Sequence, residues 1–237
     1  MALLSYLAPG DPFPPTAQAL SYPNGLLALS DELSRARLLD AYRRGIFPWF
    51  EEPQPVLWWS PDPRLVLWPE AFHRSRSLRR TLRRGRFRLT VDHCFERVMR
   101  ACAAPRSGQS GTWISPRMIA AYTALHGAGH AHSIECWDQG GALAGGLYGV
   151  RLGRAFFGES MFSRRADASK VALACLVAML RRGGGGLVDC QVESEHLSSL
   201  GAIEVPRVDF ERSLAQTVDA PLATGAWQPP AHTGELV

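Results

Sequence analysis

Three consecutive extended segments joined by glycine-containing turns constrain the fold of this chain most. His132–Trp137, Leu143–Val150 and Ala155–Phe162 are short and largely apolar, and they are separated by Asp138-Gln139-Gly140-Gly141 and by Gly153. Turns of this kind are typical of antiparallel hairpins. The three segments therefore predict a β-meander.

Helices and further strands are expected on both sides of this meander. Before it, Ser115-Pro116 gives an N-cap followed by proline at the first helical position, and Gly127 ends that helix. After it we expect helix Ala168–Leu180, strand Leu187–Val192, a helix near Ser194–Leu200, strand Ala202–Val208 and a last helix from Asp209. The order α-β-β-β-α-β-α-β predicts an α/β (α+β) fold with a mixed sheet, and it resembles the N-acetyltransferase-type (GNAT-type) fold.

A smaller domain is expected before this one. The first 25 residues are rich in proline, and a helix is predicted with Ser30 as its N-cap and Gly45 as its stop. Four prolines between Pro53 and Pro63 then interrupt regular structure. Because such stretches often separate domains, we predict a small α/β domain over residues 1–62 and a larger one over 63–237.

Composition narrows the class of protein. The chain has 237 residues, of which 46% are hydrophobic and 20% charged, so an ordinary folded core is expected. The longest apolar run, Val171–Leu180, has ten residues, whereas a membrane span needs roughly 20. Five cysteines without a C-x-x-C motif suggest reduced thiols in a cytoplasmic protein.

Arginines are concentrated in one segment. Residues 74–88 hold eight arginines and no acidic residue. On a helix, most of them would form one positively charged stripe, made of Arg76, Arg79, Arg80, Arg83 and Arg84. A solvated helix face normally mixes both signs, because like charges four residues apart repel. The stripe therefore favours contact with phosphates, with a plain solvated face as the alternative.

Two common chemistries have little support in the sequence. His126, His130 and His132 with Glu135 could bind a metal, but glycines between the first two histidines break the helical spacing of a zinc-binding pair. We therefore expect no metal. A hydrolytic triad of Ser160, His196 and Asp189 has no supporting motif, because Gly158-Glu159-Ser160 lacks the second glycine of a nucleophile elbow.

Acetyl transfer from coenzyme A also lacks its usual motif. The link before the helix at Ala168 contains no glycine and carries Asp167 at the expected cap. A pyrophosphate needs free backbone N–H groups at such a position, and a carboxylate there would repel it.

Polar and aromatic residues mark a different site. Asp189 and Gln191 share one face of an otherwise apolar strand, and buried polar groups of this kind need partners. A functional site is one way to supply these partners, and a structurally satisfied pair is the alternative. Glu159 adds a carboxylate on another strand. Trp49 and Trp113 suit stacking on unpaired bases, although tryptophans are equally ordinary in a core.

Together these segments resemble the leucyl/phenylalanyl-tRNA–protein transferase family over about residues 22–212. The resemblance is carried by a series of uncommon strings in one order: Pro23-Asn24-Gly25-Leu26-Leu27-Ala28-Leu29, Arg44-Gly45-Ile46-Phe47-Pro48-Trp49-Phe50, Leu57-Trp58-Trp59-Ser60-Pro61-Asp62-Pro63-Arg64, Gly111-Thr112-Trp113-Ile114, His130-Ala131-His132-Ser133-Ile134-Glu135, Gly158-Glu159-Ser160-Met161-Phe162-Ser163, Ala168-Ser169-Lys170 and Asp189-Cys190-Gln191.

The resemblance implies an enzyme that moves Leu or Phe, and also Met, from aminoacyl-tRNA to the N-terminal Arg or Lys of an acceptor protein. This step marks the acceptor for degradation by the N-degron pathway. It implies a cytoplasmic protein with a small N-terminal domain, a larger acetyltransferase-type domain and no cofactor, and we expect a monomer that binds no membrane. A coenzyme A-dependent acetyltransferase and a non-catalytic RNA-binding module remain the alternatives.

The same resemblance implies roles for individual residues. Asp189 and Gln191 occupy catalytic positions. Because a neutral amide is a poor base, we expect Gln191 to position the amine and Asp189 to orient Gln191. Glu159 is expected to face an ammonium group. The pocket for the amino acid side chain maps onto Leu147, Phe156, Met161, Leu173, Leu176 and Val188. The adenosine- and tRNA-binding positions map onto Trp49, Trp113, Tyr42, Tyr122, Arg76, Arg80, Arg83 and Arg84.

Overall fold

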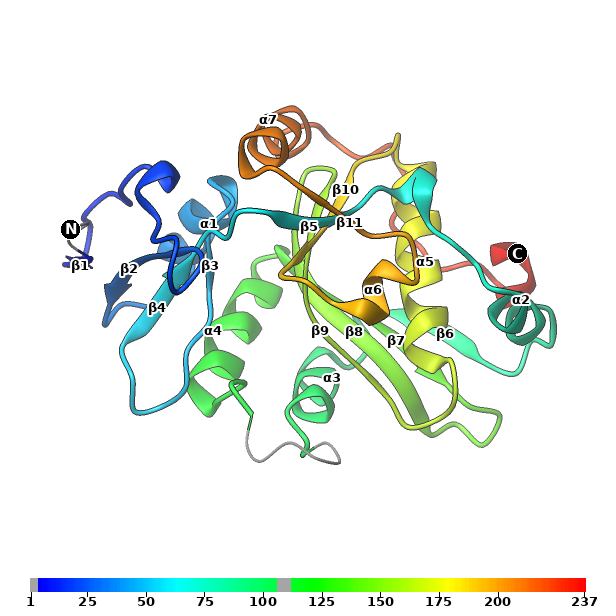
Figure 1. Ribbon diagram of the computed structural model, residues 1–237. Helices are drawn as coiled ribbons and strands as arrows, with labels where there is room; N and C mark the ends of the chain where they lie inside the picture. Colours follow the sequence, from blue (N-terminus) through cyan, green and yellow to red (C-terminus); the bar gives the residue numbers. More distant parts are fainter. Residues whose placement is uncertain (1–3, 106–111) are drawn as a thin grey trace.

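The computed structural model describes residues 4–105 and 112–237 (Figure 1). A four-stranded sheet comes first along the chain, in the order β1-β2-β4-β3. Its strands are β1 (Ser5–Leu7), β2 (Leu26–Ser30), β3 (Phe47–Pro48) and β4 (Val56–Trp59). This sheet lies beside α1 (Arg35–Arg43) and α4 (Pro116–Gly127), at the left of Figure 1.

The predicted start of the first helix is wrong. Ser30 ends strand β2, and its hydroxyl accepts a hydrogen bond from the indole N–H of Trp58 at 2.8 Å. The N-cap of α1 is instead Ser34, whose side chain accepts from the backbone N–H of Arg37. The apolar run before Ser30 forms a strand because β4 supplies its hydrogen-bonding partner.

The second sheet has seven strands in the order β11-β5-β10-β9-β8-β7-β6. The predicted meander is confirmed as β7 (Ala131–Trp137), β8 (Leu143–Leu152) and β9 (Ala155–Ser163), which pair antiparallel. β10 (Leu187–Gln191) pairs parallel to β9 and antiparallel to β5 (Arg64–Leu67), so the predicted mixed sheet is also confirmed. The edges are β6 (Arg88–Val91) and β11 (Ile203–Val205).

Helices cover both faces of the large sheet. α5 (Ala168–Arg182) packs on one face, and α3 (Phe95–Cys102) and α4 pack on the other. Neighbouring residues of a strand point to opposite faces. Accordingly, Leu147 and Phe156 join the core around α5, whereas Tyr148 and Phe157 join the core around α3 and α4.

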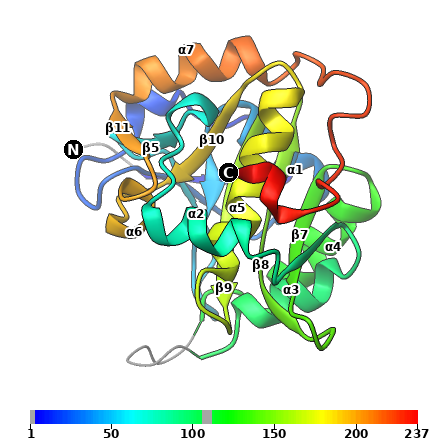
Figure 2. The same ribbon diagram turned by 90° about the vertical axis from the view of Figure 1, so that its right-hand side faces the viewer.

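The remaining helices lie at the periphery. α2 (Arg76–Arg83) and the C-terminal turn η3 (Thr233–Leu236) pack together beside α5 (Figure 2). α6 (Glu195–Ser198) and α7 (Arg207–Thr217) follow β10, and short 3-10 turns lie at η1 (Thr16–Gln18) and η2 (Pro69–Ala71). The last helix begins two residues earlier than predicted, since Pro206 ends the strand and forms the N-cap of α7.

One of the two apolar cores runs through both sheets. It joins side chains of the small sheet and α1, such as Trp58 and Leu38, to Tyr148 of the large sheet and Phe210 of α7. The chain passes from the small sheet to the large one between β4 and β5. Within the described ranges, no helix is both long enough and apolar enough to span a bilayer.

Candidate functional site

A cavity of about 700 Å³ opens between the two sheets. Its apolar wall comes from strands β8, β9 and β10 and from helix α5. All six residues predicted for the amino acid pocket line it: Leu147, Phe156, Met161, Leu173, Leu176 and Val188. Phe47 and Trp49 close it from the side of the small sheet. The volume and the apolar lining suit one bulky apolar side chain together with the groups attached to it.

Gln191 stands at the polar end of this cavity in a strained backbone conformation. Its φ angle is 67°, in the left-handed region that non-glycine residues rarely adopt. The pairing of β10 with β5 shifts register between Asp189 and Gln191. The backbone N–H of Gln191 donates to Asp189 Oδ1 at 2.9 Å, and its side-chain Nε2 donates to Glu159 Oε1 at 2.8 Å. With Nε2 bound in this way, the Oε1 atom of Gln191 is the atom left to accept a hydrogen bond from a bound amine.

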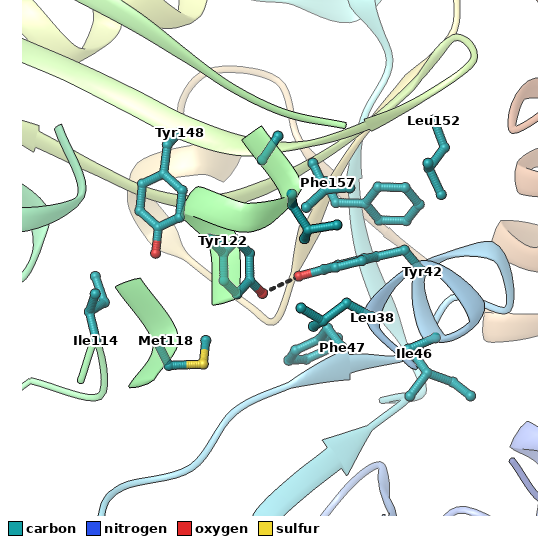
Figure 3. Close-up of a cluster of buried hydrophobic side chains, with 14 of the residues drawn as sticks. Leu38, Tyr42, Ile46, Phe47, Ile114, Met118, Tyr122, Tyr148, Leu152 and Phe157 are labelled. Carbon is teal, nitrogen blue, oxygen red and sulfur yellow. Dashed lines mark hydrogen bonds between the residues drawn. The ribbon is translucent and has the colours of Figure 1, made fainter. Parts of the chain in front are cut away.

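Glu159 is buried among hydroxyl groups. It is 7% exposed, and it accepts hydrogen bonds from Tyr42 Oη at 2.7 Å and Tyr122 Oη at 2.9 Å. The two tyrosine hydroxyls also bind each other (Figure 3). Three O–H···O contacts need three protons, and the tyrosines supply two. When Glu159 is protonated, it supplies the third proton: it then donates to one tyrosine, which donates to the other.

This environment changes the acidity of Glu159. Burial raises the pKa of Glu159 from 4.5 to about 7, and the nearby charge of Asp189 adds to the rise. Hydrogen bonds from the two tyrosines and Gln191 oppose it. A carboxyl group with a pKa of about 7 exchanges its proton close to neutral pH.

Tyr42 and Tyr122 are buried beside Glu159. Both were expected to contact adenosine or tRNA, but both are fully buried. Tyr42 comes from α1 and Tyr122 from α4, and their hydroxyls meet beneath Glu159. In this conformation they support Glu159 and offer no surface to a nucleic acid.

Asp189 has a buried partner that the sequence reasoning did not identify. Arg64 Nε donates to Asp189 Oδ1 at 2.8 Å and Arg64 Nη2 donates to Oδ2 at 2.6 Å. Neither residue is exposed to solvent. A usable signal was present, because an arginine that opens an apolar strand such as Arg64-Leu65-Val66-Leu67 needs a buried counter-charge.

The tryptophans lie at the rim of the cavity. Trp49 is 44% exposed, packs against Trp59 and lines the cavity together with Thr112 and Trp113. An exposed indole beside an opening can stack on a nucleoside base. Gly111, which belongs to the string that includes Trp113, lies outside the described residues.

The arginine stripe forms the outer face of α2. The side chains of Arg76, Arg79, Arg80, Arg83 and Arg84 are exposed, and no carboxylate within the described ranges forms an ion pair with them. Arg80 and Arg84 also line a second, open cavity with Arg86 and Arg165. Unpaired arginines on one surface attract polyanions.

The alternative sites are not assembled. Both carboxylate oxygens of Asp189 bind Arg64, so Asp189 does not orient His196 as a triad would require. His132 binds Asp92 at 2.7 Å, and His126 binds the carbonyl of Ala131. Over residues 4–105 and 112–237, no three His, Cys, Asp or Glu side chains are grouped to hold a metal ion.

Comparison with known proteins identifies the class first: the chain is an aminoacyltransferase. A family model described as leucyl/phenylalanyl-tRNA protein transferase matches residues 66–215, and the model of its N-terminal domain matches residues 31–62. The chain belongs to the leucyl/phenylalanyl-tRNA–protein transferase family.

Curated relatives cover most of this chain. The proteins named leucyl/phenylalanyl-tRNA–protein transferase from Thiobacillus denitrificans and Nitrosomonas eutropha are 58% and 54% identical to it. Each alignment covers 91% of this chain, and it covers 94% and 92% of the relatives, respectively. The relative from Aromatoleum aromaticum is 57% identical over 95% of this chain and 94% of its own length.

One solved structure, titled "The structure of L-PGS from Bacillus licheniformis", gives a TM-score of 0.38 at 10% identity. It covers 73% of this chain and 57% of that chain. The acetyltransferase-type assignment of the large sheet therefore stays a prediction.

Proposed function

We propose that this protein moves leucine, phenylalanine or methionine from aminoacyl-tRNA to the N-terminal arginine or lysine of acceptor proteins, which marks them for degradation in the cytoplasm. The observation that carries this proposal is the cavity whose apolar wall ends at Gln191 and Glu159. The wall accepts the aminoacyl side chain, and the polar end accepts the reacting amine. Trp49 and Trp113 flank the terminal adenosine, and the arginines of α2 contact the acceptor stem.

The reaction needs little beyond positioning and one proton acceptor, because an aminoacyl ester is already activated. The amine nitrogen attacks the ester carbonyl carbon, the new C–N bond forms, and the bond to the ribose oxygen breaks. Gln191 Oε1 orients the amine. Glu159 takes the proton that the amine loses and passes it to the departing ribose oxygen, so that the carboxylate is regenerated.

The acidity of Glu159 supports this assignment. An ordinary glutamate has a pKa of about 4.3, roughly 3.5 units below that of an α-amino group. At about 7, Glu159 differs from an α-amino group by about one unit, so the proton passes with a small penalty. Asp189 is unsuited to this role, because it is paired with a buried arginine and is not among the described residues that line the cavity, whereas Glu159 is.

The proposal extends to the architecture. Residues 1–62 form the small domain, residues 63–237 form a catalytic domain of the acetyltransferase type, and the protein acts as a monomer. The change of sheet between β4 and β5 supports the boundary.

Incubation with labelled Leu-tRNA or Phe-tRNA and a peptide that begins with arginine tests the activity. Label in the peptide is the expected result, and a peptide that begins with alanine is the control. Acetyl transfer from acetyl-coenzyme A without aminoacyl transfer would identify an acetyltransferase instead. Retention of tRNA without any transfer would identify an RNA-binding module.

A further inference from the structure

The guanidinium group of Arg64 is enclosed on every side. Its edge binds both oxygens of Asp189, and Nη1 donates to the carbonyl of Gly45 at 3.0 Å. The ring centres of Phe47 and Phe210 lie 4.7 and 4.6 Å from the guanidinium carbon. These partners come from the small domain, from β10 and from α7. One side chain therefore joins three parts of the molecule.

The packing around the guanidinium group of Arg64 also restricts which residue can occupy position 45. Gly45 has a φ angle of 72°, and a Cβ atom there would lie 2.6 Å from the ring of Phe210. A glycine is therefore required for Phe210 to reach Arg64.

Stability alone is a weak reason for this arrangement, because a buried ion pair is costly to desolvate and an apolar replacement is often as stable. The ion pair between Arg64 and Asp189 is also connected to the backbone of Gln191. Asp189 Oδ1, held by Arg64, accepts the backbone N–H of Gln191. A non-glycine residue in the left-handed region is strained and persists only where its surroundings hold it. The side chain of Gln191 then reaches Glu159 in the cavity.

We propose that Arg64 is a positioning residue for aminoacyl transfer. It fixes Asp189, and Asp189 holds the backbone of Gln191 in the conformation that points its amide into the cavity. This inference rests on the proposed function. Among the described residues that line the cavity, neither Arg64 nor Phe210 occurs, so both act through other residues.

The two-pronged contact explains why arginine is needed. The planar guanidinium group binds both carboxylate oxygens in one geometry, whereas a lysine ammonium is a point charge on a flexible stem. Arg64→Lys therefore keeps the charge and loses the geometry.

The test compares Arg64→Lys with Arg37→Lys. Arg37 is also buried, pairs with Glu32 and lies over the ring of Phe13, but it is not among the residues that line the cavity. For Arg64→Lys we expect kcat for transfer from Phe-tRNA to an Arg-peptide to fall by about tenfold to a hundredfold, with KM for both substrates within about twofold. Both variants should lower the unfolding temperature by similar amounts, because each loses a buried arginine. Arg37→Lys, however, should keep the kcat of the parent.

A second pair of variants covers the case in which Arg64→Lys does not fold. Phe210→Leu removes one ring from the guanidinium and leaves the ion pair, and Phe72→Leu, at a buried ring in the other core, is its control. We expect a several-fold loss of kcat in Phe210→Leu alone. In an Asp189→Asn background, this loss should disappear.

Two results would overturn the inference in different ways. If the parent transfers the amino acid and both Arg64→Lys and Phe210→Leu, where folded, keep its kcat, Arg64 is only structural and the inference is wrong. If the parent itself transfers nothing, the proposed function fails and the inference fails with it.

Discussion

Among single residues, Glu159 lies in an unusual environment for a carboxyl group. Its carboxyl group is buried, yet three side chains donate to it and the neighbouring Asp189 carries the same charge. Removing the ionisable carboxyl group of Glu159 from water therefore costs free energy on folding. A purely structural site would be served by an amide, which makes the same kind of contacts without a charge.

The pH dependence of stability tests this reading of Glu159. The pKa of Glu159 in the folded state is about 7, above its ordinary 4.5, so the folded state binds the proton more tightly. That stabilisation is complete below about pH 4.5 and is lost as the pH rises through about 7. Relative to Glu159→Gln, the parent should lose up to about 3 kcal/mol of unfolding free energy across this range.

Urea unfolding at a series of pH values measures this loss. Glu204→Gln, at an exposed carboxylate on β11, is the control and should show a constant difference from the parent. A pH-independent difference between Glu159→Gln and the parent would show that Glu159 titrates normally.

At the scale of elements, the outer surface of α2 carries exposed arginines that form no ion pair with any carboxylate of the described residues. Neutralising Arg80, Arg83 and Arg84 together should weaken tRNA binding and reduce the slope of log affinity against log salt by up to about three units. Arg43, Arg44 and Arg212 are the matched control, because each already pairs with an aspartate. The measurement is tRNA affinity over a range of salt concentrations. An unchanged slope in the α2 variant would identify the stripe as ordinary solvated surface.

The elements also show which parts of the fold a sequence can reveal. The strands β7, β8 and β9 follow one another and are joined by glycine turns, so local patterns predict them. β5 has four residues, and its partners β10 and β11 lie more than a hundred residues further along the chain. No pattern within a short stretch of sequence predicts a pairing between strands so far apart. The strands β4 and β6 are not predicted either, because four residues carry little periodicity.

The same distinction holds for the site. The six pocket residues follow from the resemblance and line one cavity, although their contact with a substrate is still a prediction. Arg64 ends one of the strings that carry the resemblance, but the string alone indicates no role for it. Its role depends on Asp189, 125 residues away, and on Phe210, whose ring it meets only in the folded chain. The contacts of Tyr42 and Tyr122 with Glu159 could not be predicted for the same reason, since they depend on packing across α1 and α4.

At the scale of the whole molecule, the shared core predicts how the protein unfolds. Leu38 of α1 is fully buried in the core that joins both sheets. Leu38→Ala should cost about 2–5 kcal/mol through the lost contacts and the cavity left behind. Because the core is continuous, the loss should move one cooperative transition and leave it single.

Urea unfolding followed by circular dichroism and by tryptophan fluorescence checks this expectation. Leu180→Ala, in the other core, is the companion variant and should also give a single transition. Two separated transitions in Leu38→Ala would mean that the small sheet unfolds alone.

Arg64 has a consequence for the exchange of parts between relatives. The two family models match residues 31–62 and 66–215, and Arg64 lies in the gap between them. A chimaera joined there takes Gly45 and Phe47 from one parent, and Asp189 and Phe210 from the other. If the parents differ at these positions, the hybrid can assemble both sheets and still turn over slowly. The two parts of such a hybrid therefore have to match at the partners of Arg64, which lies in the short segment between them.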